Sequence, residues 1–192
     1  MASNVASVSA VFTDPPFAQS LFNNPKWAWL WIITRWYVGY TWFTSGLGKL
    51  SNPAWTQTGE ALKGFWERAV AIPEPPARPL IAFDWYLGFL QAMIDAQAYT
   101  WFAKLIFIGE ILVGIALILG LFTGIAAFFG GFMNWNFMMA GTASINPVLF
   151  TLSILLMLAW KTAGWWGLDR FLLPALGTPW QPGKVFGQKL SE

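Results

Sequence analysis

Hydrophobic and polar positions alternate along the chain in blocks, and four of the apolar blocks are long. A helix needs roughly 20 mostly apolar residues to cross a lipid bilayer. The qualifying blocks lie at about residues 27–48, 102–122, 125–141 and 147–166. The pattern therefore predicts an all-α integral membrane protein, in which four transmembrane helices form one bundle and residues 1–192 form a single domain.

The segment between the first two spans, about residues 52–99, has a different pattern. It contains two stretches in which apolar residues recur at helical spacing with polar residues between them. These apolar positions are Leu62, Phe65, Trp66 and Ala69 in the first stretch, and Phe89, Leu90, Met93 and Ile94 in the second. Helices with one apolar face suit the membrane surface, so we expect an insert of interfacial amphipathic helices.

Composition strengthens the membrane assignment. The chain is 56% hydrophobic and only 10% charged, whereas soluble domains average about 25% charged residues. Its 14 Trp and 17 Phe residues agree with the preference of aromatic rings for membrane interfaces. The net charge of +2 is too small to indicate a nucleic-acid partner.

The chain contains neither Cys nor His. This absence excludes thiol chemistry and haem ligation by histidine, and it removes the ligands of most transition-metal sites. We therefore expect no metal and no haem ligated by this chain. Residues 1–20 lack both a positive start and a long apolar core, so they are not expected to be a secretory signal peptide.

The ends of the spans give a weaker indication of orientation. Lys and Arg are nearly equal in number on the two sides, which limits the positive-inside rule. The basic segment after the fourth span, with Lys184 and Lys189, favours both termini in the cytoplasm and a location in the plasma membrane. We expect the pair Asp169–Arg170 to cap the exit of the fourth span.

Two charged residues lie inside predicted spans. Glu110 interrupts the run LIFIGEILVGIALILGLFTG, and Arg35 lies within WIITRWYVG. A charge at membrane depth costs about 2.5–3.5 kcal/mol on insertion scales, so each should be paired or functional. Both lie near the centre of a span and both have a glycine four residues later, which predicts a direct Arg35–Glu110 contact between the first two spans. Such a pair could serve as a helix register device or as a ligand and proton site.

Asn134 is the other polar candidate within a span. It lies near the middle of the third span, in FMNWNFMM. Asn136 is two positions on and about 200° around the helix, so both side chains cannot face the same groove. Arg35, Glu110 and Asn134 are thus expected at similar depth between the first three spans.

Several motifs together resemble the DoxX family. GEILVGIALILGLFTG resembles its second-span motif, and Arg35 followed by GLGKL and NPAW resembles its first span. FMNWNFMMAG, then NPVLF and GLDR, resemble its third and fourth spans. The long insert is similar to that of the DoxD branch, the large subunit of membrane thiosulfate:quinone oxidoreductase. The polar positions that the resemblance implies are Arg35, Lys49, Glu110, Asn134 and Asp169.

The resemblance implies an oxidoreductase subunit that passes electrons from thiosulfate, or a similar small donor, to quinone, with a second subunit as partner. Glu110 and Arg35 would be the catalytic candidates, and these two with Asn134 and Lys49 would bind the quinone or the anion. The alternative is a non-catalytic accessory subunit of a larger respiratory or photosynthetic complex, binding membrane lipid or quinone. A transporter is less favoured, because no repeat or broken span is visible.

Overall fold

The computed structural model describes residues 13–177, and every regular element in that range is a helix. Residues 1–12, Lys184 and Lys189, which entered the predictions on the signal peptide and orientation, lie outside the described range. The four longest helices are α2 (Ala28–Leu50), α6 (Tyr99–Leu119), α7 (Thr123–Met139) and α8 (Asn146–Leu158). The predicted helical class is therefore confirmed.

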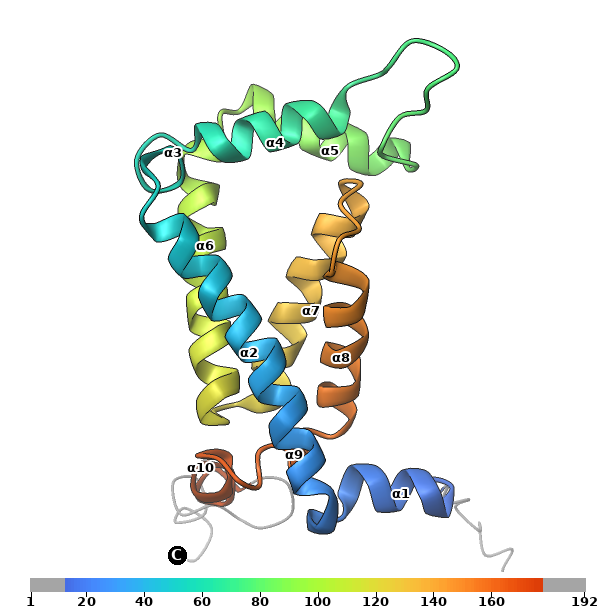
Figure 1. Cartoon of the computed structure of the whole chain (residues 1–192), viewed down its shortest axis with the longest axis vertical. Coiled ribbons are helices and arrows are strands. Elements are labelled where there is room, and N and C mark those ends of the chain that lie inside the picture. Colours follow the sequence, from blue (N-terminus) through green and yellow to red (C-terminus); the bar gives the residue numbers. More distant parts are fainter. Residues whose placement is uncertain (1–12, 178–192) are drawn as a thin grey trace, which may run out of the picture.

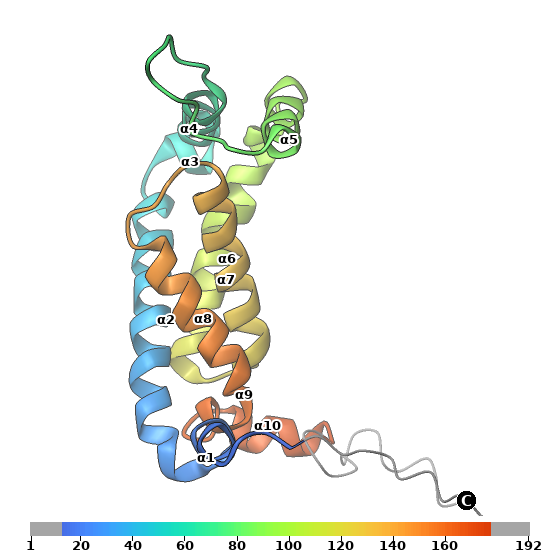
Figure 2. The same ribbon diagram turned by 90° about the vertical axis from the view of Figure 1, so that its right-hand side faces the viewer.

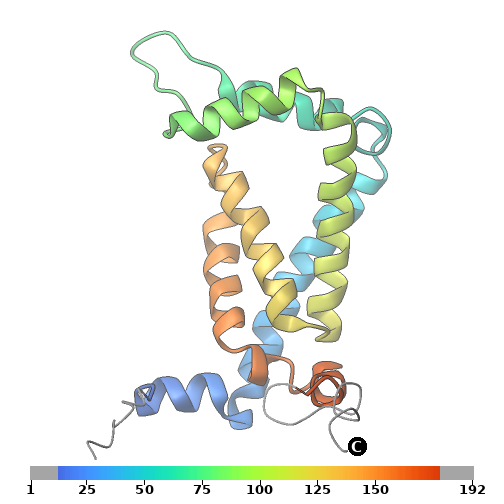
Figure 3. The same cartoon turned by 180° about the vertical axis from the view of Figure 1, so that it is seen from behind.

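The long helices are arranged as two pairs (Figure 1). Helix α2 packs along α6 and α7 packs along α8, with neighbours running in opposite directions. The pairs meet near the short α6–α7 turn and separate toward the other end, as the view from behind also shows (Figure 3). The protein thus has a narrow end, at the α6–α7 turn, and a wide end.

Shorter helices cover both ends (Figure 2). Helices α4 (Glu60–Val70) and α5 (Asp84–Asp95) cross the wide end, while α1 (Pro16–Asn23) and α10 (Asp169–Ala175) lie at the narrow end. The remaining elements are η1 (Pro25–Trp27), α3 (Pro53–Thr56) and α9 (Trp160–Ala163). Both limits of the described chain therefore lie at the narrow end.

The amphipathic insert forms the expected helices. Leu62, Trp66 and Ala69 are buried on the inner face of α4, and Leu90 is buried on α5. They form a second apolar core, separate from the core between the long helices. This second core holds α4 and α5 across the wide end.

The outer surface of the long helices is apolar. Helix α6 is the one helix among residues 13–177 that is both long and apolar enough to cross a membrane by itself, and α8 is a shorter apolar helix. Only 33% of the most apolar window of α6 is buried, so most of this apolar surface is not covered by the described residues. Large exposed apolar side chains continue over the neighbouring helices, including Trp36, Ile125, Phe128 and Leu158. Soluble monomers rarely expose apolar patches of such extent.

The exposed threonines of these helices bond to their own backbone. The hydroxyls of Thr41, Thr44 and Thr151 each donate to the carbonyl four residues earlier, at 2.8–2.9 Å. This arrangement satisfies a hydroxyl without water. It suits a surface that faces lipid.

Glycines bring α2 and α6 into close contact. A Cβ atom on Gly39 would lie 3.0 Å from the Gly114 carbonyl oxygen, and one on Gly46 would lie 2.6 Å from Ile111 Cγ1. A Cβ on Gly114 would lie 2.6 Å from the backbone nitrogen of Phe43. The close approach predicted from Gly39 and Gly114 is therefore present, and these contacts fix the register of the two helices.

The fourth predicted span differs from the structure in its length. Helix α8 ends at Leu158, and Ala159 separates it from the single turn of α9. The apolar composition continues to Trp166, but the chain turns there to dock against the α6–α7 connection. Hydropathy alone does not detect this change of direction.

The glycine contact gives a direct test. Gly114→Ala should lower the free energy of unfolding by about 1–3 kcal/mol, because the added methyl group meets backbone atoms that cannot move aside. Gly109→Ala on the same helix is the control, since its Cβ would meet only Met133 Sδ at 3.8 Å. Thermal unfolding in detergent measures both variants, and equal stabilities would contradict the proposed packing.

Candidate functional site

The first polar group within the bundle is an ion pair between α2 and α6. Lys49 Nζ donates to both carboxylate oxygens of Glu110, at 2.9 and 2.7 Å, and to Ser45 Oγ at 2.8 Å. The Glu110 side chain is buried, whereas the Lys49 side chain is partly exposed and its Nζ lies 5.2 Å from the centre of the Trp55 ring. The carboxylate thus has a bidentate cationic partner, which offsets much of its burial cost.

The predicted Arg35–Glu110 contact is wrong. Gly39 lies opposite Gly114, and the two helices run in opposite directions. Arg35 is four residues from this level toward the narrow end, while Glu110 is four residues from it toward the wide end. Eight residues correspond to about 12 Å along the helix axes. Along the sequence, both charges lie just before the centre of their own span. Because α2 and α6 run in opposite directions, these two positions lie on opposite sides of the level at which the helices cross.

Arg35 is instead held by the segment that follows α8. Its Nη1 and Nη2 atoms donate to the carbonyl oxygens of Ala163 and Trp166, both at 3.2 Å. Gly120 and Gly167 lie directly against the guanidinium, and a side chain at either position would collide with it. Gly120 also has φ +67° at the end of α6, a conformation that glycine adopts without strain. Arg35 therefore fastens the C-terminal segment to the narrow end.

Asp169 completes this attachment, and its predicted role as a cap for the fourth span is wrong. Its carboxylate accepts hydrogen bonds from the backbone N–H groups of Phe122 and Thr123, at 2.6 and 2.8 Å. These groups begin α7, where a carboxylate is favoured by the free N–H groups and the helix dipole. Arg170 points elsewhere, with its guanidinium 5.1 Å from the Trp165 ring.

Asn134 is fully buried on α7, and neither atom of its amide has a hydrogen-bond partner among the described residues. Trp42 Nε1 and Ser153 Oγ are buried with no partner in the same range. Asn134 therefore forms no hydrogen bond with Lys49, Glu110 or Arg35.

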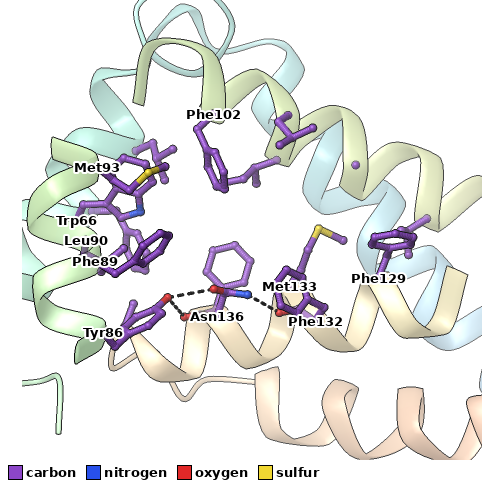
Figure 4. Close-up of a pocket in the computed structure, with 18 of the residues that line it drawn as sticks. Trp66, Tyr86, Phe89, Leu90, Met93, Phe102, Phe129, Phe132, Met133 and Asn136 are labelled. Carbon is purple, nitrogen blue, oxygen red and sulfur yellow. Dashed lines mark hydrogen bonds between the residues drawn. The ribbon is translucent and has the colours of Figure 1, made fainter. Parts of the chain in front are cut away.

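An apolar pocket of about 600 Å³ lies between the interfacial helices and the separated ends of α6 and α7 (Figure 4). Helices α4 and α5 supply one side, and α6 and α7 supply the others. Aromatic rings and methionines dominate the lining, among them Phe65, Trp66, Phe89, Met93, Phe102, Phe132 and Met133. The described residues that line it include no Asp, Glu, Lys or Arg. The pocket can thus hold a neutral, ring-bearing or hydrocarbon ligand.

The polar contacts of the pocket come from Tyr86 and Asn136. Tyr86 Oη donates toward the Asn136 backbone oxygen at 3.0 Å and lies 3.2 Å from its Oδ1, and Asn136 Nδ2 donates to Phe132 O at 2.8 Å. Burial raises the pKa of Tyr86 to about 12, so the phenol is a neutral donor at ordinary pH. The two Tyr86 contacts join α5 to α7 at the pocket wall (Figure 4).

Sequence reasoning missed Tyr86 and Asn136 as a pair. The helical angle between Asn134 and Asn136 showed that they face different ways, but it did not show which face is open. The candidate residues Arg35, Lys49, Glu110 and Asn134 do not line this pocket, although their neighbours Gly109 and Met133 do. Glu110 is therefore one residue from the pocket wall, on the side of α6 that faces α2.

The helical fold, apolar exterior and internal ion pair define a helical membrane protein. The DoxX family profile matches residues 30–142, which is more than half of the chain. The chain therefore belongs to the DoxX family, whose members are membrane proteins. No curated protein matches the chain significantly, and neither does any solved structure.

The Lys49–Glu110 pair predicts that loss of the lysine alone destabilises the protein more than loss of both charges. Lys49→Met should lower the free energy of unfolding by about 3–5 kcal/mol, because it leaves the Glu110 carboxylate buried without its cation. Adding Glu110→Gln should recover part of that loss. A double-mutant cycle on thermal unfolding measures the coupling, and the Arg35→Met/Glu110→Gln cycle serves as the uncoupled control. Strong coupling of Glu110 to Arg35 rather than to Lys49 would contradict the structure.

Proposed function

We propose that this DoxX protein spans the plasma membrane four times, through α2, α6, α7 and α8, with α4 and α5 at one surface. The apolar exterior of these helices and the absence of Asp, Glu, Lys and Arg from α7 and α8 support the proposal. Both described chain ends then lie on one side, which we assign to the cytoplasm.

Cysteine labelling tests this topology. Because the chain has no Cys, single cysteines at Ser20 and Thr58 should react with an impermeant thiol reagent from opposite sides of sealed vesicles. Labelling of both positions from the same side would refute the topology.

We propose that the protein binds quinone in the α4–α5–α6–α7 pocket. The observation that carries this proposal is an apolar cavity of about 600 Å³ with one small polar pair in its wall. That volume falls within the range of small-molecule sites, roughly 300–1,000 Å³. A quinone ring could stack on the aromatic lining, while its carbonyl oxygen accepted a hydrogen bond from the second amide hydrogen of Asn136 Nδ2. The hydrocarbon tail would extend toward lipid between α6 and α7.

We further propose that quinone binding serves electron transfer from thiosulfate or a similar small donor, as in the DoxD branch. Reduction of a quinone to a quinol consumes two electrons and two protons. This chain has no Cys or His to carry sulfur chemistry or to bind a redox metal in the usual way, so a partner subunit would deliver the electrons. Glu110 directly follows Gly109 of the pocket wall and is paired with Lys49. These two groups would exchange protons, and Arg35 would act by holding the narrow end together.

An accessory role has a specific observation in its favour. Lys49 and Glu110 bond to each other, and Arg35 bonds to backbone carbonyls. The lining of the pocket carries no charge among the described residues. A protein of this kind could bind quinone or lipid within a larger respiratory or photosynthetic complex without taking part in the chemistry.

Filling the pocket tests the proposal. Gly109 lines the pocket and has room for a side chain, so Gly109→Phe should place a ring in the cavity. We expect quinone affinity, measured by quenching of tryptophan fluorescence in nanodiscs, to fall about tenfold or more, a loss of about 1.4 kcal/mol. Gly48→Phe is the matched control, because a Cβ at Gly48 meets nothing within 4 Å.

The same variants distinguish the two roles. If the protein is an oxidoreductase subunit, donor-dependent quinone reduction in membranes with co-purified partners should fall in Gly109→Phe and persist in Gly48→Phe. Quinone binding without any donor-dependent reduction would favour the accessory role. Equal quinone affinity in the two variants would refute this pocket as the quinone site.

A further inference from the structure

Three helices direct buried polar groups toward one region in the interior of the bundle. Asn134 lies on α7, Trp42 on α2 and Ser153 on α8, and all three are buried. The Trp42 Nε1 atom, the Ser153 hydroxyl and both polar atoms of the Asn134 amide lack a hydrogen-bond partner among residues 13–177. Buried polar groups without a partner cost about 1–3 kcal/mol each, so native proteins rarely leave them unsatisfied.

Two glycines of α7 place these groups beside one another. A Cβ at Gly130 would lie 2.9 Å from Trp42 Nε1, and a Cβ at Gly131 would lie 3.2 Å from Ser153 Cβ. Gly130 is four residues and Gly131 three residues before Asn134, so all three occupy one helical face. Helical side chains lean toward the N-terminus of their helix. From this rule we expect the Asn134 amide to extend over the glycines, toward the indole N–H and the hydroxyl.

We infer that this cluster of Trp42, Asn134 and Ser153 binds one or two water molecules inside the bundle. The cluster contains an indole donor, an amide with both functions and a hydroxyl with both functions. The indole can only donate, so the ligand must accept a hydrogen bond, and the amide and hydroxyl oxygens can accept hydrogen bonds that the ligand donates. None of the three side chains is charged, which favours a small neutral molecule over an ion. Water meets these requirements and typically makes about three bonds in such sites.

The water site is distinct from the quinone pocket and does not rest on the proposed function. Val113 lies 3.3 Å from the Cβ position of Gly130 and also lines the pocket. The cluster is therefore behind the inner wall of the pocket, on its side toward α2 and α8. Water there would connect α2 with the α7–α8 pair at a level where the other neighbouring side chains are apolar.

Nuclear magnetic resonance on the full-length protein in nanodiscs provides the primary test. The indole ¹⁵N–¹H signal of Trp42, assigned by its loss in Trp42→Phe, should show a rotating-frame cross-peak to long-lived water. The exposed Trp166 side chain should show only the exchange of surface solvent. A Trp42 signal with no water cross-peak would overturn the inference, whatever the variants show.

Stability provides a second, independent reading. If water bridges the cluster, Asn134→Leu should lower the melting temperature by about 3 °C or more. The substitution removes the amide that holds the water, so the Trp42 indole and the Ser153 hydroxyl are left without a hydrogen-bond partner. Ser153→Ala should then cost less in the Asn134→Leu background than in the wild type. Thr151→Val, which removes an exposed hydroxyl from the same helix, is the control. A melting temperature that rises in Asn134→Leu would show that the amide is dry and would overturn the inference.

Discussion

The close contact between α2 and α6 determines where the polar residues of this protein can act. Gly39, Gly46 and Gly114 let the two backbones approach until a methyl group would collide with the neighbouring helix. This contact sets an antiparallel register, and the register assigns each charge its partner. Lys49 reaches Glu110 toward the wide end, whereas Arg35 is left at the narrow end to bind the segment after α8. In a membrane, where a lone charge is costly, such pairing is a condition for the fold.

At the wide end, the separation of the two helix pairs leaves space for a ligand instead of a close helix contact. There α6 and α7 move apart, and α4 and α5 close the opening with aromatic and methionine side chains. The result is an uncharged pocket whose polar contacts lie in its wall, where Tyr86 joins α5 to Asn136 of α7. Glu110 pairs with Lys49 on the face of α6 that meets α2, and the adjacent face of the same helix lines the pocket. This division is why we connect quinone binding with the pocket and proton exchange with the nearby Lys49–Glu110 pair.

Much of this architecture could be predicted from the sequence, because hydropathy and helical spacing are local properties. The long apolar helices and the buried face of α4 follow from them directly, whereas Phe89 of α5 is exposed. The partners of Glu110 and Asp169 could not be predicted in this way. Position within a span does not give depth unless the direction of the helix is included, and that omission produced the wrong Arg35–Glu110 pair. Asp169 accepts from N–H groups 46 and 47 residues away, and nothing in the local sequence indicates such a contact. The Tyr86–Asn136 pair depends likewise on the docking of an interfacial helix onto α7.

The central claim is that quinone enters the space between α5, α6 and α7, and photo-crosslinking tests it most directly. An azidoquinone would be irradiated with the full-length protein in native membranes, with and without excess unlabelled quinone, and the modified peptides identified by mass spectrometry. We expect the azidoquinone to label residues that line the pocket, such as Phe89, Phe102 and Met133. Excess unlabelled quinone should prevent this labelling. The proposed quinone site would be contradicted if the labelling that unlabelled quinone prevents were confined to α2 and α8, or if unlabelled quinone prevented no labelling at all.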